Sequence, residues 1–147
     1  MLFLKPIHPR AQLPTKGSVG SSGYDVCSIE RVVLEPGVPN LIHTGLQVTY
    51  IEPQFEIQVR PRSGNSLKKG FTVANTPGTI DNDYRGEICI ILVAFKAQVV
   101  IEEGMKIAQL VPMYVDDLHP LWSDTMENTA RGSGGFGSTD AKSPSGS

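Results

Sequence analysis

Glycine and proline interrupt this chain so often that long helices cannot form between them. The 147 residues include 15 glycines and 11 prolines, which are spread through the sequence rather than gathered in one place. Glycine destabilises the interior of a helix and proline breaks it, whereas both residues are common in the turns that join short strands. The spacing therefore favours an all-β domain, as an antiparallel sandwich, a jelly roll or a distorted barrel.

Short runs rich in Val, Ile, Leu and Phe lie between these interruptions. Several runs alternate apolar with polar residues, which is the two-residue period of a strand with one buried face. Turn signals such as Glu35-Pro36-Gly37 and Pro77-Gly78 separate them. One short helical turn is expected over Asn65–Lys69. The predicted strands are Val32–Leu34, Leu46–Ile51, Phe55–Val59, Glu87–Phe95, Val99–Ile101 and Lys106–Met113.

Charge and residue usage narrow the classes of function. The net charge of −2 does not favour a nucleic-acid or membrane-surface binder. Cys27 and Cys89 are the only cysteines, so we expect reduced thiols in or beside the core. His8, His43 and His119 lack metal-ligand spacing, and a zinc site held by the protein is not expected. The N-terminal residues are interrupted by too many prolines for a signal peptide, which favours a cytoplasmic protein.

The chain is expected to end in an arm that follows the β domain. We assign residues 1–113 to the barrel, 114–130 to a linker, 131–140 to the arm and 141–147 to a disordered tail. The linker can span roughly 55–60 Å when extended, whereas a compact chain of this length has a radius of gyration of about 15 Å. The arm can therefore reach a neighbouring subunit.

The arm, RGSGGFGSTD, has the composition of a phosphate-binding segment. Its glycines let backbone N–H groups approach phosphate oxygens, Arg131 supplies positive charge, and Ser138 and Thr139 supply hydroxyl donors. Phe136 offers a flat face for a base. A dinucleotide fold is excluded because no helix can follow, and a P-loop because the lysine is missing. A disordered glycine-serine tail is the alternative on composition alone.

Two further segments carry polar side chains suited to chemistry. GTIDNDYRGE, residues 78–87, places acids, a tyrosine and an arginine between two apolar runs, so we expect them at the exposed tip of a hairpin-like connection. An ordinary turn rich in Asn and Asp is the alternative reading of that segment. RPRSG, residues 60–64, follows a predicted strand and offers Arg62 and Ser63 beside a glycine, which suits phosphate oxygens.

Read together, these segments resemble the five ordered motifs of the trimeric all-β dUTPase family. The resemblance covers almost the whole chain. The matching segments are SSGYDV at 21–26, PRSG at 61–64, GTIDNDYRGE at 78–87, KIAQLVP at 106–112 and RGSGGFGST at 131–139.

The resemblance implies a jelly-roll subunit of a homotrimer whose active sites are shared between subunits. The implied reaction is Mg²⁺-dependent hydrolysis of dUTP to dUMP and pyrophosphate, which limits uracil incorporation into DNA and supplies dUMP for dTMP synthesis. Asp81 corresponds to the general base that activates a water for in-line attack on the α-phosphorus. Asp25 is expected to reach the metal through a water, while the substrate phosphates hold the ion themselves.

The resemblance also assigns the substrate contacts. Tyr84 is expected to pack on the deoxyribose and exclude a 2′-hydroxyl, Asn75 to read the uracil edge, and Phe136 to stack on the ring. A mismatched 4-amino group of cytosine is a stronger reason for rejection than the methyl of thymine, because buried polar mismatches cost more. The other implied substrate-binding residues are Arg62, Ser63, Gly64, Gly78, Gln109, Arg131, Gly137, Ser138 and Thr139.

Some positions depart from the commonest family spelling. Ser22 replaces a frequent alanine, Asn65-Ser66 a common Leu-Ala, and Asp140 a glycine, which leaves affinity and arm mobility undetermined.

Two other functions stay open at this point. A dCTP deaminase-like enzyme would share the barrel, but it needs a glutamate acting at cytosine C4 and no arm of this kind. A nucleotide-gated regulatory protein would use ordering of the arm to signal to a partner.

Overall fold

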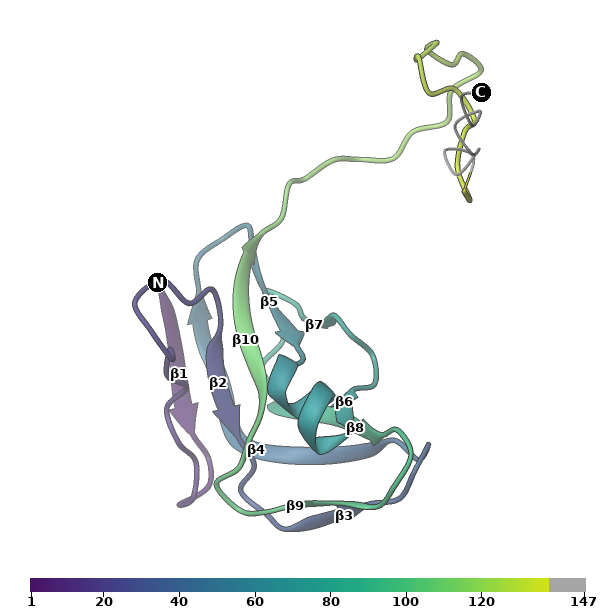
Figure 1. Cartoon of the computed structure of the whole chain (residues 1–147). Coiled ribbons are helices and arrows are strands. Elements are labelled where there is room, and N and C mark those ends of the chain that lie inside the picture. Colours follow the sequence, from purple (N-terminus) through teal and green to yellow (C-terminus); the bar gives the residue numbers. More distant parts are fainter. Residues whose placement is uncertain (138–147) are drawn as a thin grey trace, which may run out of the picture. The chain divides into compact units, whose positions relative to one another are not determined.

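A computed structural model describes residues 1–137 (Figure 1). They fall into two units, Met1–Asp117 and a second that begins at Leu118. The first unit holds all the described strands and one short helical turn, η1 (Asn65–Lys69). The strands are β1 (Leu2–Pro6), β2 (Tyr24–Cys27), β3 (Val32–Leu34), β4 (Asn40–Ile51), β5 (Phe55–Arg60), β6 (Phe71–Val73), β7 (Gly78–Ile80), β8 (Glu87–Ala94), β9 (Val99–Ile101) and β10 (Lys106–Tyr114).

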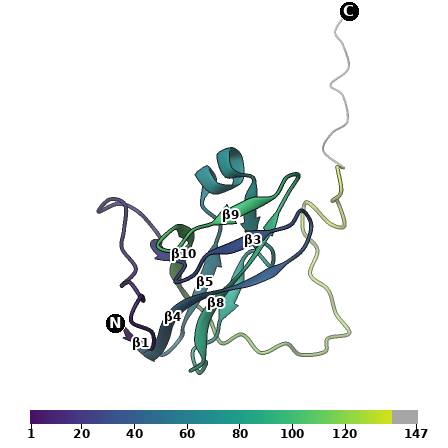
Figure 2. The ribbon, with the colours of Figure 1, turned by 90° about the horizontal axis from the view of Figure 1, so that it is seen from below.

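The strands form two four-stranded sheets, in the orders β1-β4-β8-β6 and β2-β10-β5-β7, and a separate β3-β9 pair. Every pairing between these strands is antiparallel. Figure 2 shows β3 and β9 side by side. Two four-stranded antiparallel sheets with few local hairpins are the arrangement of a jelly roll, which confirms the all-β prediction.

The predicted strand boundaries hold best where the apolar runs are unbroken. The bounds of β3 and β9 are as predicted, and those of β5, β8 and β10 differ by one residue at one end. The start predicted for β4 at Leu46 is wrong, because the strand already begins at Asn40. Strands β1, β2, β6 and β7 were not predicted, and β6 and β7 are only three residues long each. The helical turn expected over Asn65–Lys69 is confirmed.

The core lies between the inner faces of the sheets. Strand β8 alternates half-buried and buried residues along its whole length, so Ile88, Ile90, Leu92 and Ala94 all face inward. Burial of each of the larger apolar side chains stabilises the fold by about 1.5–3 kcal/mol. The largest fully buried side chains are Phe71, Leu34, Ile42, Ile57, Ile88, Ile90, Leu92, Ile101, Ile107, Leu110, Val26 and Val48.

Thr44 is one of the buried polar residues of the described chain, along with Ser28 and Asn65. Its side chain is 0% exposed, and its hydroxyl donates a hydrogen bond to the carbonyl oxygen of Ile88. The register between β4 and β8 shifts between His43 and Gln47, so the hydroxyl bonds to β8 where the regular ladder is interrupted. This bond ties the start of β4 to the strand that follows the Asp81 loop.

Replacing Thr44 with valine is expected to lower the free energy of unfolding by about 1–3 kcal/mol, because the carbonyl of Ile88 loses its buried donor. Urea unfolding measures the effect as a lower midpoint. The control is Thr49→Val, since Thr49 is exposed and its hydroxyl bonds to Phe3 at the surface; it is expected to change stability by less than about 0.5 kcal/mol. Equal midpoints for the two variants would contradict the role given to the Thr44 hydroxyl.

The described part of the second unit, residues 118–137, contains neither helix nor strand. A turn is closed by the backbone N–H of Gly132 donating to the carbonyl of Thr129, and Arg131 Nε donates to the carbonyl of Gly134 at 2.8 Å. Within residues 1–137, no helix is long and apolar enough to cross a membrane.

Candidate active site

The loop from Asp81 to Gly86 joins β7 in one sheet to β8 in the other. The predicted hairpin-like connection is therefore wrong, because β7 pairs with β5 and β8 pairs with β4 and β6. The predicted exposure is correct, since Asp81 and Tyr84 are both exposed. A crossing between sheets places the loop at the end of the barrel, where side chains from both layers can meet.

Hydrogen bonds hold this loop in one conformation. Asn82 Nδ2 donates to the carbonyls of Glu52 and Phe55, each at 2.9 Å, and so fastens the loop to the turn between β4 and β5. The backbone N–H of Tyr84 donates to the carbonyl of Asp81, and Arg85 donates to the carbonyl of Asn82. The Asp81 carboxylate consequently stands on an anchored turn although it is exposed.

Tyr84 lies against Gly86, where only a glycine leaves room for its ring. A Cβ at position 86 would stand 2.3 Å from the Tyr84 hydroxyl oxygen and 2.6 Å from Cζ. The hydroxyl donates to the carbonyl of Glu87 at 2.9 Å, which fixes the direction of the ring. The ring is thereby positioned without being buried, with 44% of its surface exposed.

A pocket brings together four of the predicted site residues, Asn75, Gly78, Asp81 and Tyr84. Apolar strand residues such as Val59 and Ile80 form part of its wall. The segment before β7 is shaped by a cis peptide bond between Thr76 and Pro77 and is joined to β8 by a hydrogen bond from the Ala74 N–H. An apolar cleft with an amide, a carboxylate and an aromatic ring suits a nucleoside.

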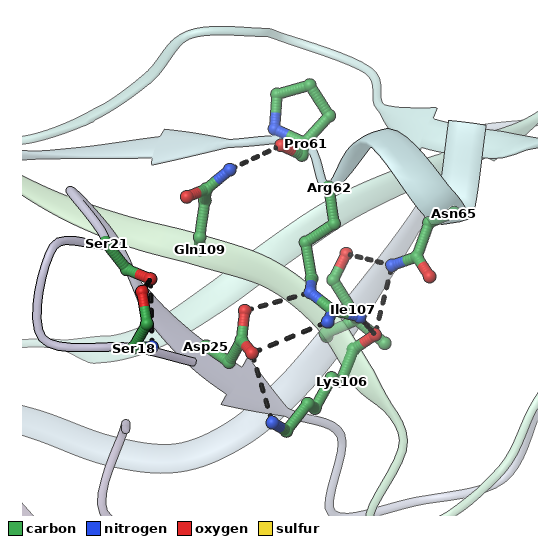
Figure 3. A network of polar contacts seen from close by, with 9 residues as sticks. All are labelled: Ser18, Ser21, Asp25, Pro61, Arg62, Asn65, Lys106, Ile107 and Gln109. Carbon is green, nitrogen blue, oxygen red and sulfur yellow. Dashed lines mark hydrogen bonds and ion pairs between the residues drawn. The ribbon is translucent and has the colours of Figure 1, made fainter. Parts of the chain in front are cut away.

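A second set of predicted residues, Asp25, Arg62 and Gln109, lies in a polar network outside that pocket (Figure 3). Arg62 Nε donates to Asp25 Oδ1 at 2.8 Å, and Lys106 Nζ lies 3.1 Å from Asp25 Oδ2. Only 14% of the Asp25 side chain is exposed, so its charge is balanced by two cations in partial burial. Sequence reasoning did not assign Lys106 to this cluster.

The rest of this network positions the turn that carries Ser63 and Gly64, both of which are exposed. Asn65 is only 2% exposed, and its Nδ2 donates to the carbonyl of Lys106 at 3.0 Å. Asn65 therefore joins this turn to β10. The sequence offered no local signal for that contact.

Gln109 spans the sheet within the same network. Its Nε2 donates to the carbonyl of Pro61 at 2.9 Å, and its side chain crosses directly over Gly23. A Cβ at position 23 would stand 2.3 Å from Gln109 Oε1, which explains the glycine of the SSGYDV segment. The first, second and fourth motif segments therefore build one surface.

The two clusters draw on different parts of one sheet. In the order β2-β10-β5-β7, Asp25 lies on the edge strand β2 and Gly78 on the edge strand β7. Gln109 lies on β10, and Arg62 follows the end of β5. None of these three network residues lines the pocket that contains Asp81 and Tyr84, so one protomer presents an apolar pocket and a polar network as separate features.

The arm residues lie in the second unit. Arg131, Phe136 and Gly137 are exposed, and Phe136 has a positive φ of 52°. Ser138 and Thr139, which were assigned to phosphate contacts, lie outside the described residues. The same holds for Asp140.

The comparison with protein families now identifies this arrangement. The dUTPase family model matches residues 9–140, a span that contains all five motif segments. The chain belongs to the dUTPase family. The resemblance found in the sequence is confirmed, and within this dUTPase-family chain the pocket and the polar network correspond to different motifs.

Known relatives agree with this assignment. The deoxyuridine 5'-triphosphate nucleotidohydrolase of Wolinella succinogenes is 44% identical over 137 residues, which cover 92% of this chain and 91% of that protein. The dUTPase of Staphylococcus bacteriophage 80alpha, solved with dUPNHPP, is 27% identical with a TM-score of 0.85, covering 94% of this chain and 97% of that one. The dUTPase of phage phi11 of S. aureus, described with a structural Mg(II) ion, is 24% identical with a TM-score of 0.77, covers 87% of this chain and 99% of that one, and is similar in fold.

Proposed function

We propose that this dUTPase-family chain is a dUTP diphosphatase, which hydrolyses dUTP to dUMP and pyrophosphate. The observation that carries the proposal is the pocket in which Asp81, Tyr84 and Asn75 line one apolar cleft. The names of its relatives support the same substrate. Two cysteines that are both free suit a reducing compartment, and we place the activity in the cytoplasm.

The chemistry that we propose uses Asp81 as the general base. Its carboxylate accepts a proton from a water as the water oxygen attacks the α-phosphorus in line. The bond from that phosphorus to the bridging oxygen breaks, and the electron pair leaves with pyrophosphate. Since the loop is anchored through Asn82, the carboxylate is held in place before substrate arrives.

The triphosphate is proposed to lie on the network around Arg62. Hydrogen bonds to Asp25 and to the carbonyl of Lys106 use three of the five N–H donors of Arg62 and leave others for phosphate oxygens. Gln109, Ser63 and Gly64 border the same surface and are assigned to phosphate contacts.

Mg²⁺ fits this surface only as an ion carried by the substrate. Both oxygens of Asp25 already bind cationic side chains, so direct coordination would break an ion pair, whereas contact through a water would leave it intact. Bound there, the ion would neutralise charge on the triphosphate. Lys106 adds a fixed positive charge to the same function.

We further propose a homotrimer with shared active sites. The support is that Asp25, Arg62 and Gln109 of one protomer lie outside the pocket that Asn75, Asp81 and Tyr84 line, so the motifs are divided between two surfaces. The pocket of one copy would face the Arg62 network of a second copy. The arm, with Arg131, Phe136, Gly137, Ser138 and Thr139, would close over the nucleotide.

Pyrophosphate release from dUTP, dCTP, dTTP and UTP, measured side by side, tests the activity. Release from dUTP at a kcat/KM far above the other three is expected. Ammonia release from dCTP without pyrophosphate from dUTP would instead establish a deaminase. Sedimentation of the purified protein tests the trimer separately, because a monomer with full dUTP turnover would contradict only the shared site.

Changing Gly86 to alanine is expected to weaken the discrimination of dUTP against UTP. The new Cβ would push the Tyr84 ring away from the position that excludes a 2′-hydroxyl. Shape filters against one hydroxyl supply about 10²-fold discrimination, and we expect the dUTP to UTP ratio of kcat/KM to fall by roughly tenfold. Gly20→Ala is the control, since nothing lies within 4 Å of its added Cβ. An unchanged ratio in the Gly86 variant would remove Tyr84 from this role.

A further inference from the structure

His43, Glu87 and Cys89 form a cluster to which the proposed dUTPase chemistry gives no role, although Glu87 and Cys89 also line the pocket that contains Asp81 and Tyr84. They come from the neighbouring strands β4 and β8, where His43 pairs directly with Cys89 and Glu87 lies two residues earlier on the same face. His43 Nδ1 lies 2.9 Å from Glu87 Oε2 and 3.6 Å from Cys89 Sγ. One ligand atom from each residue lies within 4.8 Å of the others, and among the described residues this is the only such group of three.

From this geometry we infer that His43, Glu87 and Cys89 bind a divalent transition-metal ion of the zinc class. Imidazole nitrogen, thiolate sulfur and carboxylate oxygen are the ligand types that zinc takes, with bonds of about 2.0–2.3 Å. Tetrahedral angles then place neighbouring ligand atoms roughly 3.3–3.8 Å apart. The separation of Nδ1 and Sγ, 3.6 Å, lies in that interval. The separation of Nδ1 and Oε2, 2.9 Å, is slightly shorter, because a hydrogen bond joins these two atoms where the ion would lie.

The cluster is held by contacts outside the three ligands. The backbone N–H of Gly45 donates to Glu87 Oε1 at 2.8 Å, which leaves Oε2 directed at His43. The backbone N–H of His43 donates to Glu30 Oε1 at 3.0 Å. Such supporting bonds orient ligands before the metal arrives.

Charge and access favour a cation at this position. Glu87 and Glu30 lie at the cluster, and Arg10, which borders the same hollow, is paired with Glu103 at 3.3 Å. That hollow is lined by His43 and Glu87, which are 43% and 24% exposed, so an ion can reach these two ligands from solvent. Cys89 lines the pocket on the Asp81 side, together with Glu87. Water would complete the coordination, since three protein ligands leave one tetrahedral position open.

The proton balance of binding follows from the groups present. Burial, with the charge of Glu87 adding to it, raises the pKa of the Cys89 thiol to about 11. The hydrogen bond to Glu87 raises the pKa of His43. Burial disfavours the Glu87 carboxylate, but hydrogen bonds from His43 and Gly45 outweigh it and lower the pKa of that group. As the sulfur–metal bond forms, the thiol proton passes to the buffer. The proton between His43 Nδ1 and Glu87 Oε2 must also leave Nδ1; it passes to the buffer from the imidazolium, or to Nε2 in the neutral ring.

The chemistry separates this site from the Mg²⁺ proposed at the triphosphate. Magnesium takes oxygen ligands and keeps several waters, and a thiol with an imidazole does not suit it. The inference needs neither a trimer nor dUTP turnover. It therefore stands or fails independently of the proposed function.

Cobalt and zinc binding to the full-length, metal-stripped protein tests the site. Co²⁺ is expected to bind one ion per chain with a near-ultraviolet thiolate-to-cobalt absorption band, and Zn²⁺ is expected to displace it. In competition with a chromophoric chelator, Cys89→Ser and His43→Gln should weaken Zn²⁺ binding beyond the about 10–100-fold that loss of a supporting residue costs. Cys27→Ser is the control, because Cys27 is the other free, half-buried thiol. This variant should bind Zn²⁺ as the parent does.

Each result decides the inference. A thiolate band that survives in Cys89→Ser and vanishes in Cys27→Ser would move the site to β2 and overturn it. Failure of Co²⁺ and Zn²⁺ to saturate at one ion per chain would overturn it as well. Circular dichroism of each variant identifies loss of fold, and Glu87→Gln, which keeps an acceptor for Gly45, provides a third ligand test that preserves the local hydrogen bond.

Discussion

Asp81→Asn is expected to lower kcat for dUTP by about 10²–10⁴, the range that a positioned general base contributes. Asparagine has nearly the same shape and keeps the loop conformation, because the anchoring bonds come from Asn82 and from the backbone of Tyr84. Substrate binding should therefore change little while turnover collapses, the pattern of an interaction lost mainly in the transition state. Pre-steady-state and steady-state pyrophosphate release separate the two effects.

The matched control is Asp116→Asn, which removes another exposed carboxylate. Asp116 and Asp81 line the same shallow hollow beside the β4–β5 turn, so both substitutions change the local charge equally. A control with near-parent kcat would assign the effect to the position of the Asp81 carboxylate. Equal losses in both variants would indicate a general electrostatic effect and remove Asp81 from the role of base.

Truncation after Ala130 is expected to leave the fold intact and lower kcat/KM for dUTP by at least about 10²-fold. Removal of Phe136 forfeits base stacking of roughly 1–3 kcal/mol, and removal of Arg131 forfeits a charged hydrogen bond of about 1.5–3 kcal/mol. The two losses together correspond to a factor of at least about 10². Among the described residues, the buried core ends at Val111, so thermal unfolding should be unchanged.

The control for this truncation is a chain that ends at Asp140, which keeps the whole RGSGGFGSTD segment. It should retain near-parent kcat/KM. Full turnover in the shorter chain would show that the arm has no part in the reaction. A loss of thermal stability there would show that residues after Ala130 support the fold.

The strands that could be predicted from the sequence are those whose apolar run and bounding turn residues lie together in one short segment. Runs such as Val99–Ile101 and Val32–Leu34 are bounded by turn residues and apolar throughout, so they could be placed without knowledge of their partners. The first half of β4 could not, because Asn40, His43 and Thr44 read as polar loop. The side chains of His43 and Thr44 are satisfied by long-range contacts, Thr44 to Ile88 and His43 to Glu87, whereas Asn40 bonds to the nearby carbonyl of Val38.

The same distinction between local and long-range signals explains which site residues could be predicted from the sequence. Asp81 and Tyr84 were found through a short segment whose residue order carries the signal, and the structure places them in one pocket. The contacts of Asp25 with Arg62 and Lys106 join positions far apart in the chain, and so does the pairing of His43 with Cys89. Spacing within one segment cannot reveal partners that only strand register brings together.

The separation of the Arg62 network from the pocket lined by Asn75 and Tyr84 carries an evolutionary consequence. Under the proposed roles, residues that contact the base and sugar can change while the ion pairs of Asp25 with Arg62 and Lys106 stay as they are. Asp81 shares the pocket with Asn75 and Tyr84, so a descendant with altered base preference would have to keep the Asp81 carboxylate in position while its neighbours change.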